Sequence, residues 1–135
     1  MKLNLIFIIT LALTANVFAT ETGFKLSART IAHYREFQDE VKDVQVRAKL
    51  MKRVLAVVPF RHLLEGKVAP DTALEIADED WELYVKAMRG VDTLALGELQ
   101  KFAGAEAVST DNTIDDQRFW RKIYDQLGKA RAPGK

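Results

Sequence analysis

The serines and histidines are the residues with which a search for nucleophilic catalysis begins. Hydrolytic triads join a serine to a histidine and an acid, and the serine often lies in a Gly-x-Ser-x-Gly turn. The chain has two serines, Ser27 and Ser109, and two histidines, His33 and His62. Neither serine lies in such a turn. We therefore interpret Ser27 as the N-cap of a helix, Ser109 as a loop residue and His62 as a helix-end residue.

Two segments partly resemble metal sites. His33 and Glu36 lie three residues apart, so a helix would place both on one face, where they could bind one metal ion. Two ligands do not complete a site, and the chain lacks the Glu-x-x-His units of helical di-metal bundles. The acidic stretch 111–116 lacks the glycine and the closing glutamate of a calcium loop. We interpret His33 as solvent-facing and the stretch 111–116 as a loop, and we expect no metal and no cofactor.

Acidic and aromatic side chains leave two other kinds of site open. A glycosidase-like pair of carboxylates needs a separation of about 5 to 9.5 Å, which the sequence does not fix among its 19 acids. A small carboxylate-dependent hydrolase is therefore an alternative function. Five aromatic residues lie at helical spacing on apolar faces, which favours core packing over a ligand-binding cleft. They are Trp81, Tyr84, Phe119, Trp120 and Tyr124.

The distribution of charge is the strongest functional signal. Residues 46–64 contain five bases and no acid, whereas residues 68–85 contain six acids and no base. On helices these charges would lie opposite the apolar faces, so both charged faces should face water and not each other. Ordinary solvated faces explain such runs, and the functional interpretation is a surface whose fields steer a protein partner. The residues predicted to bind a partner are Lys42, Lys49, Lys52, Arg53, Glu75, Glu79 and Glu82.

A long first helix of about residues 28–58 is predicted to position the basic face. Its apolar residues recur at alternating spacings of three and four, which is the pattern of a heptad seam. The helix either runs the length of an elongated bundle or breaks once, near Gln45, where two flanking valines lower helix propensity. Its second half has further apolar residues from Val46 to Val57, so the other helices should surround that half. The seam consists of Tyr34, Phe37, Val41, Val44, Ala48, Met51, Leu55 and Val58.

Shorter helical segments follow. Thr113 and Asp116 resemble a capping box at the start of the last helix, and residues 104–112 are small and polar, as in a loop. No stretch alternates strictly like a strand, so we expect no ordered sheet. The predicted segments are a turn at residues 59–64, helices at 71–89 and 92–103, and a helix that begins at 113 and stops at Gly128.

These segments predict an all-α fold, a four- to five-helix bundle organised around the long first helix. We expect a single helical domain of residues 28–130, between a flexible N-terminal tail at 20–27 and a disordered tail at 131–135. Residues 1–19 have the charged start, apolar run and small-residue end of a signal peptide, with cleavage expected after Ala19. The apolar run is too short for the roughly 20 residues of a membrane span, so we expect no stable membrane insertion after cleavage.

Composition limits the possible partners. The predicted mature chain has 19 bases against 19 acids, because residues 1–19 contain one base and no acid. A neutral chain is a poor candidate for nucleic-acid binding. The absence of cysteine excludes thiol catalysis and disulfides and fits a periplasmic or secreted bacterial protein.

The sequence therefore predicts a small exported, non-enzymatic binding protein of the bacterial envelope. It would dock another envelope or secreted protein through a charged helix face, as an inhibitor, an immunity protein or a small chaperone, and would be a monomer or weak homodimer. Two alternatives stay open: the carboxylate-dependent hydrolase, and a self-assembling coiled-coil protein that uses the exposed first half of the long helix.

Overall fold

The computed structural model describes residues 23–132, so the predicted signal peptide, residues 20–22 of the predicted tail and residues 133–135 lie outside it. Within that part of the chain the fold is mostly helical, as predicted, but it has six α-helices and one 3₁₀ helix instead of the four or five helices expected. The elements are β1 (Gly23–Lys25), α2 (Ala28–Phe37), η1 (Gln38–Glu40), α3 (Val44–Val54), α4 (Val58–Leu64), β2 (Ala73–Glu75), α5 (Asp78–Met88), α6 (Thr93–Ala107) and α7 (Ile114–Arg131).

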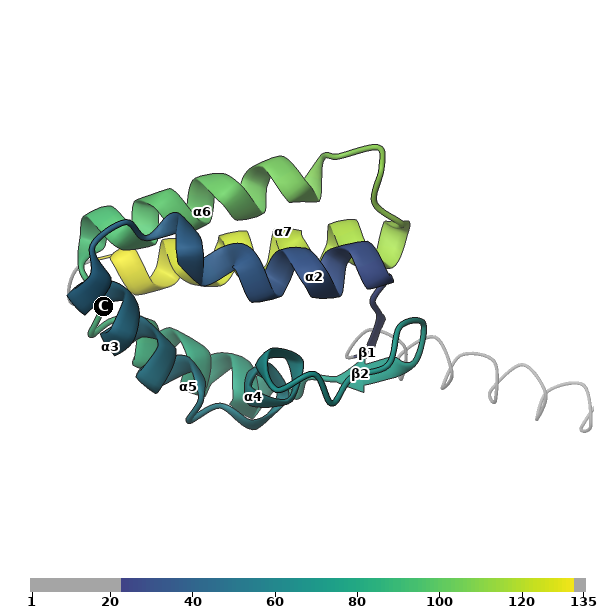
Figure 1. Cartoon of the computed structure of the whole chain (residues 1–135), viewed down its shortest axis with the longest axis horizontal. Helices are drawn as coiled ribbons and strands as arrows, with labels where there is room; N and C mark the ends of the chain where they lie inside the picture. Colours follow the sequence, from purple (N-terminus) through teal and green to yellow (C-terminus); the bar gives the residue numbers. More distant parts are fainter. Residues whose placement is uncertain (1–22, 133–135) are drawn as a thin grey trace, which may run out of the picture.

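The helices form two groups, and α7 belongs to one of them and contacts the other. Figure 1 shows α2, α6 and α7 lengthwise in the upper part of the view, with α3, α4, α5 and the two strands below them. The last helix, α7, packs against α6, α5 and β1. It buries seven residues, more than any other described element. The prediction that the second half of the first helix is the central element is therefore wrong, because α7 has that place.

The first helix is not continuous, which was one of the two expected outcomes, but it breaks twice and not once. The chain leaves α2 after Phe37, turns through η1, and starts α3 with Asp43 as N-cap, whose carboxylate accepts hydrogen bonds from the backbone N–H groups of Gln45 and Val46 at 2.9 and 3.1 Å. The break therefore lies at residues 38–43, just before the predicted position, and a second one at residues 55–57 precedes α4.

Burial explains why the heptad seam fails after the first break. Tyr34 and Phe37 are buried, but Val44 is 66% and Val58 45% exposed, whereas Leu50 and the neighbouring Val54 and Val57 are buried instead. The turn rotates the second apolar set into the core, so that both halves bury their apolar side chains in one small domain. The coiled-coil alternative needs an exposed apolar seam in the first half of the segment. Tyr34 and Phe37 of that seam are buried in the core instead.

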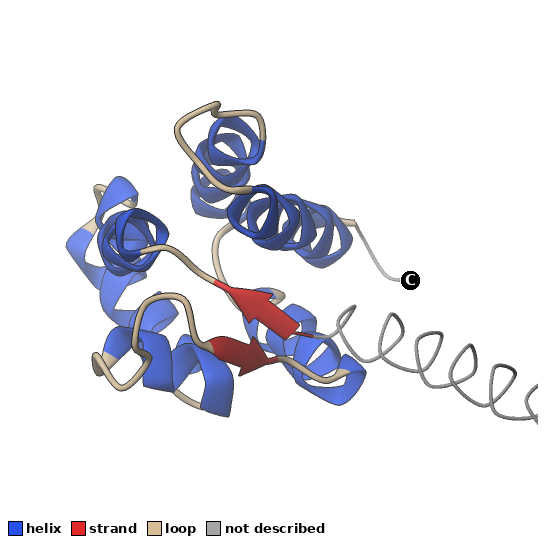
Figure 2. Cartoon of the chain, turned by 90° about the vertical axis from the view of Figure 1, so that its right-hand side faces the viewer, coloured by secondary structure: helices blue, strands red, loops and turns tan. Residues whose placement is uncertain are grey.

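A two-stranded antiparallel sheet corrects two further expectations. β1 pairs with β2 so that Phe24 lies opposite Leu74, and the central residue of each strand is buried. β1 was expected within a flexible tail, and β2 within a helix over residues 71–89. That helix, α5, begins only at Asp78, where Asp80 accepts a hydrogen bond from the N–H of Ala77 at 3.1 Å. Strands of three residues are too short for alternation to reveal them. Figure 2 shows the two strands side by side, running in opposite directions.

Two boundaries near the C-terminus also differ from expectation. α6 continues to Ala107, so the loop begins later than residue 104, and α7 passes Gly128 to end at Arg131. The capping box at the start of α7 is confirmed: the hydroxyl of Thr113 accepts from the N–H of Asp116, and the Asp116 carboxylate accepts from the N–H of Thr113, both at 3.0 Å. The last turn of α4 contains His62, as predicted.

Aromatic rings join the two groups of helices. Phe60 of α4 lies 4.7 Å from the ring of Tyr84 on α5 and 5.8 Å from that of Tyr34 on α2, and the Tyr34 ring lies 6.0 Å from Trp120 on α7. Burial raises the pKa of Tyr34 and Tyr84 above the usual range of a phenol, so both stay neutral. Core packing is confirmed for Trp81, Tyr84, Phe119 and Trp120, and wrong for Tyr124, which is 40% exposed.

Candidate interaction surface

The basic face is smaller than predicted. Lys49 and Lys52 are exposed on α3, and within the described residues neither forms an ion pair. Arg53 is half-buried: its Nη1 donates to the carbonyl of Ala87 at 3.2 Å, and its guanidinium fills the space beside Gly90. Arg53 therefore fastens the end of α3 to the C-terminal turn of α5, where a cation also complements the helix dipole.

The acidic face is also smaller than predicted, because only two of its three residues lie on α5. Glu79 and Glu82 are exposed on α5, and no ion pair involving either is found in residues 23–132. Glu75 lies in β2, paired with Gly23, and so does not belong to the helix face. The helices α3 and α5 pack against each other, but Glu82 lines a pocket between α5 and α7. The separation into a positive side and a negative side therefore stays a prediction.

Lys42 belongs to a different place. It lies in the connection between η1 and α3 and lines a pocket of about 370 Å³ against α6. Two bases and two acids line this pocket, so its charge is balanced. The two acids are Glu40 and Glu98, so this pocket brings two carboxylates together, as the hydrolase alternative requires. The lining residues are Glu40, Lys42, Glu98, Lys101, Phe102 and Ala105.

A groove of about 290 Å³ separates the end of α3 from the second half of α5. Its apolar floor includes Leu83, which is 51% exposed, and no acid lines it. Sequence reasoning missed this groove, and the signal that could have found it is a leucine on the charged side of α5. The lining residues are Arg53, Ala56, Val57, Leu83, Lys86 and Ala87.

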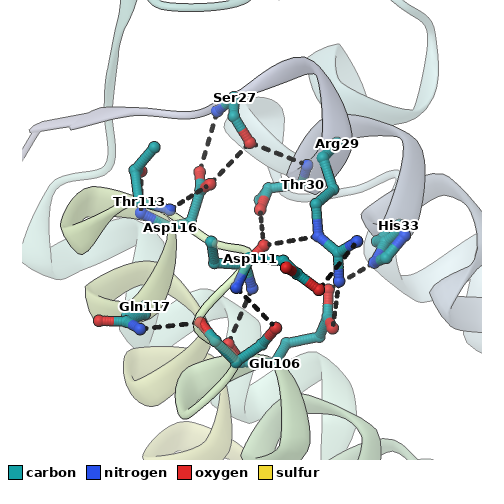
Figure 3. Close-up of polar contacts among 11 residues, drawn as sticks. Ser27, Arg29, Thr30, His33, Glu106, Asp111, Thr113, Asp116 and Gln117 are labelled. Atoms are coloured by element: carbon teal, nitrogen blue, oxygen red, sulfur yellow. Dashed lines mark hydrogen bonds and ion pairs between the residues drawn. The ribbon is translucent and has the colours of Figure 1, made fainter.

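A buried carboxylate, Asp116, connects the starts of two helices (Figure 3). It accepts hydrogen bonds from the N–H and the hydroxyl of Ser27, at 2.9 and 2.6 Å, in addition to the one from Thr113. Ser27 is the predicted N-cap of α2, and its Oγ accepts from the N–H of Thr30. Burial acts to raise the pKa of Asp116, but these hydrogen bonds outweigh it and hold that pKa below its usual range.

The same cluster continues along α2. The Nδ1 atom of His33 lies 2.5 Å from Oε1 of Glu106 at the end of α6, and Arg29 Nη2 lies 3.7 Å from the other Glu106 oxygen. Asn112 accepts from Arg29 Nε at 3.0 Å and donates to the Glu106 carbonyl at 2.8 Å. His33 was expected to face solvent without a partner, which is wrong, because its ring contacts the Glu106 carboxylate.

This cluster secures the loop between α6 and α7. The carbonyl of Ser109 accepts from Gln117 Nε2 at 2.8 Å, which fits its predicted role as a loop residue. Asp111 supplies a 4.0 Å ion pair to Arg29. In the described ranges no group of three or more acids and histidines has the arrangement of a metal site. The polar contacts between α2 and the loop are thus stabilising contacts that hold chain segments together.

Comparison with known proteins assigns no function to the chain. Among the described helices, none is long and apolar enough to cross a membrane. No family model, curated protein or solved structure matches the chain. The functional argument therefore depends on the surface of α3 and α5.

Proposed function

We propose that the protein is a small, non-enzymatic binding protein of the bacterial envelope that docks another envelope or secreted protein through the exposed surface of α3 and α5. The observation that carries this proposal is the pair Lys49 and Lys52, two exposed lysines on a helix that itself contains no acid. The predicted signal peptide at residues 1–19 supports export.

Exposed lysines that form no ion pair contribute little to the stability of the fold. Surface charges typically change stability by less than about 0.5 kcal/mol when substituted. They do act over distance, because clustered charge of one sign accelerates the encounter with a partner of opposite sign. The acids Glu79 and Glu82 on the adjoining helix give the surface a second sign and therefore a defined orientation for the partner.

The proposal predicts a separation between folding and binding. We expect the double reversal Lys49→Glu with Lys52→Glu to leave the melting temperature nearly unchanged and to slow partner association several-fold, since rim charges act mainly on the association rate. The difference should shrink with salt, because the screening length falls from about 10 Å at 0.1 M to about 3 Å at 1 M.

The experiment captures partners from the envelope fraction of the source cells with the wild-type protein and measures association rates of the purified partner. The matched control is Lys101→Glu with Arg121→Glu, which makes the same change in charge at exposed residues of α6 and α7. If the Lys49 and Lys52 reversal folds and binds the partner at the wild-type rate in low salt, docking through this surface is refuted.

A further inference from the structure

The groove between α3 and α5 has the features of a socket for one apolar side chain. Its volume of about 290 Å³ lies at the lower limit of ligand-binding pockets, and Leu83 is half-exposed on its floor. Leu83 follows Glu82 on the solvent side of α5, while Ala56 and Val57 complete the floor from the connection between α3 and α4. An apolar anchor in this place would remove Leu83 from water.

The charged residues that line the groove have one sign. They are Arg53 and Lys86, and no acid is among the lining residues. The nearest acids on the outer side of α5 are Glu82, which precedes Leu83, and Glu79, one turn before Leu83. The basic rim therefore lies toward the C-terminal end of α5, and an occupant with acids over that end would avoid the acidic first half of this helix.

Arg53 is already oriented for a carboxylate. Its bond to the Ala87 carbonyl uses one of five guanidinium N–H donors and fixes the side chain beside the groove. A side chain that is fixed before binding loses less conformational freedom when a carboxylate arrives. Guanidinium–carboxylate contacts are also the stronger, geometrically specific kind of charged hydrogen bond.

We propose that this groove receives an acidic segment of the protein partner, with one apolar side chain buried against Leu83 and carboxylates over Arg53 and Lys86. This inference rests on the proposed function and names the chemistry of the partner. Charge complementarity selects the occupant: a basic segment would face like charges, and a neutral one would bring no counter-charge to the two cations that line the groove.

The test uses a fluorescein-labelled synthetic peptide that repeats glutamate and leucine at helical spacing, titrated into the full protein and followed by anisotropy. One matched peptide replaces leucine with serine, and another replaces glutamate with lysine. We expect the acidic leucine peptide to bind, each matched peptide to bind at least about tenfold more weakly, and salt to weaken binding.

The variants localise the binding. Leu83→Ser and Lys86→Glu should each weaken peptide binding by roughly five- to tenfold while the melting temperature stays near that of the wild type. The matched controls are Leu94→Ser, at a leucine of α6 that is 79% exposed, and Lys101→Glu, at an exposed lysine of the same helix. Both controls should bind the peptide like the wild type.

Three outcomes would overturn the inference. The first is that folded Leu83→Ser and Lys86→Glu bind the peptide as the wild type does. The second is that the peptide fails to bind while vesicles of phosphatidylglycerol and phosphatidylcholine bind wild type better than these variants, which would make the occupant a membrane. The third is that sedimentation detects a dimer that Leu83→Ser abolishes, which would make the occupant a second copy.

The captured partner separates this inference from the proposed function. If the Lys49 and Lys52 reversal slows partner binding but Leu83→Ser and Lys86→Glu do not change it, the surface docks the partner and the groove is not its socket. If none of these changes affects partner binding, both proposals fail.

Discussion

Asp116 is a single carboxylate that serves two helix starts. It completes the capping box of α7 with Thr113 and also binds Ser27, the N-cap of α2, which lies 89 residues away in the sequence. The local half of this arrangement could be predicted, because a capping box spans four consecutive residues. The contact with Ser27 could not, because it depends on how α2 and α7 are placed in the fold.

Asp116→Asn should destabilise the protein by about 1.5 to 3 kcal/mol at neutral pH, since charge-assisted hydrogen bonds to a buried carboxylate are lost. The folded-state pKa lies below the ordinary 3.8, so the stabilisation by the ionised form is complete above that value and is lost as pH falls through the lower folded pKa. Urea unfolding at neutral and at acidic pH measures the difference, which should shrink in acid.

Asp111→Asn is the matched control for this effect. Asp111 lies in the loop just before α7 but is exposed and pairs with Arg29 only at 4.0 Å, so its substitution should change stability by about 0.5 kcal/mol or less. Equal losses for Asp111→Asn and Asp116→Asn, or a loss at Asp116 that does not depend on pH, would contradict the assigned role of Asp116.

Trp81 tests the aromatic core at the level of one side chain. It is 5% exposed, and its ring lies 5.4 Å from Phe60 and 6.5 Å from Phe24. Trp81→Ala should therefore cost about 3 to 5 kcal/mol, whereas Leu94→Ala at a 79% exposed residue should cost less than about 0.5 kcal/mol. A loss below 1 kcal/mol for Trp81→Ala in denaturant unfolding would place that ring outside the core.

The helices α2 and α3 show what an apolar pattern does and does not determine. The pattern correctly predicted helical structure on both sides of residues 38–43. It could not show the break, because Val41 continues the heptad spacing and is itself buried. Two apolar sets were visible in the second half, and only tertiary packing decided that Leu50 and Val54 are buried while Val44 is exposed.

Glycines within α6 offer a test of element stability. Gly97 lies inside the helix, and an added Cβ there would meet only the end of the Arg131 side chain, at 3.5 Å. Gly97→Ala should therefore stabilise the protein by about 0.5 to 1 kcal/mol, because glycine loses more backbone freedom on folding than alanine. At Gly104 a Cβ would lie 3.1 Å from the Tyr124 ring, so Gly104→Ala should gain less or lose stability.

Urea unfolding of both glycine variants makes the comparison direct. The two substitutions add the same methyl group to the same helix, so their difference isolates the contact with Tyr124. If Gly104→Ala stabilises the protein as much as Gly97→Ala, the packing of Tyr124 over α6 is looser than the structure indicates.

The candidate surface was only partly predictable from sequence. Charge runs correctly located exposed Lys49, Lys52, Glu79 and Glu82. They did not show that α3 and α5 adjoin, because this contact joins segments separated by α4, β2 and their connections. The groove at Leu83 arises from that contact, so the leucine on the charged side of α5 could indicate an apolar surface there but not the residues opposite it.

For the molecule as a whole, the aromatic core predicts one cooperative unfolding transition. Trp81 on α5 and Trp120 on α7 report on the two groups of helices, and rings of Phe60 and Tyr34 connect them: Phe60 lies 5.4 Å from Trp81 and 5.8 Å from Tyr34, which lies 6.0 Å from Trp120. Loss of one group would expose this shared core, so neither should unfold alone. Fluorescence of Trp81→Phe and Trp120→Phe, each with one remaining tryptophan, should share its midpoint with the circular dichroism of the same variant. Separate midpoints within either variant would show that the two groups of helices unfold independently.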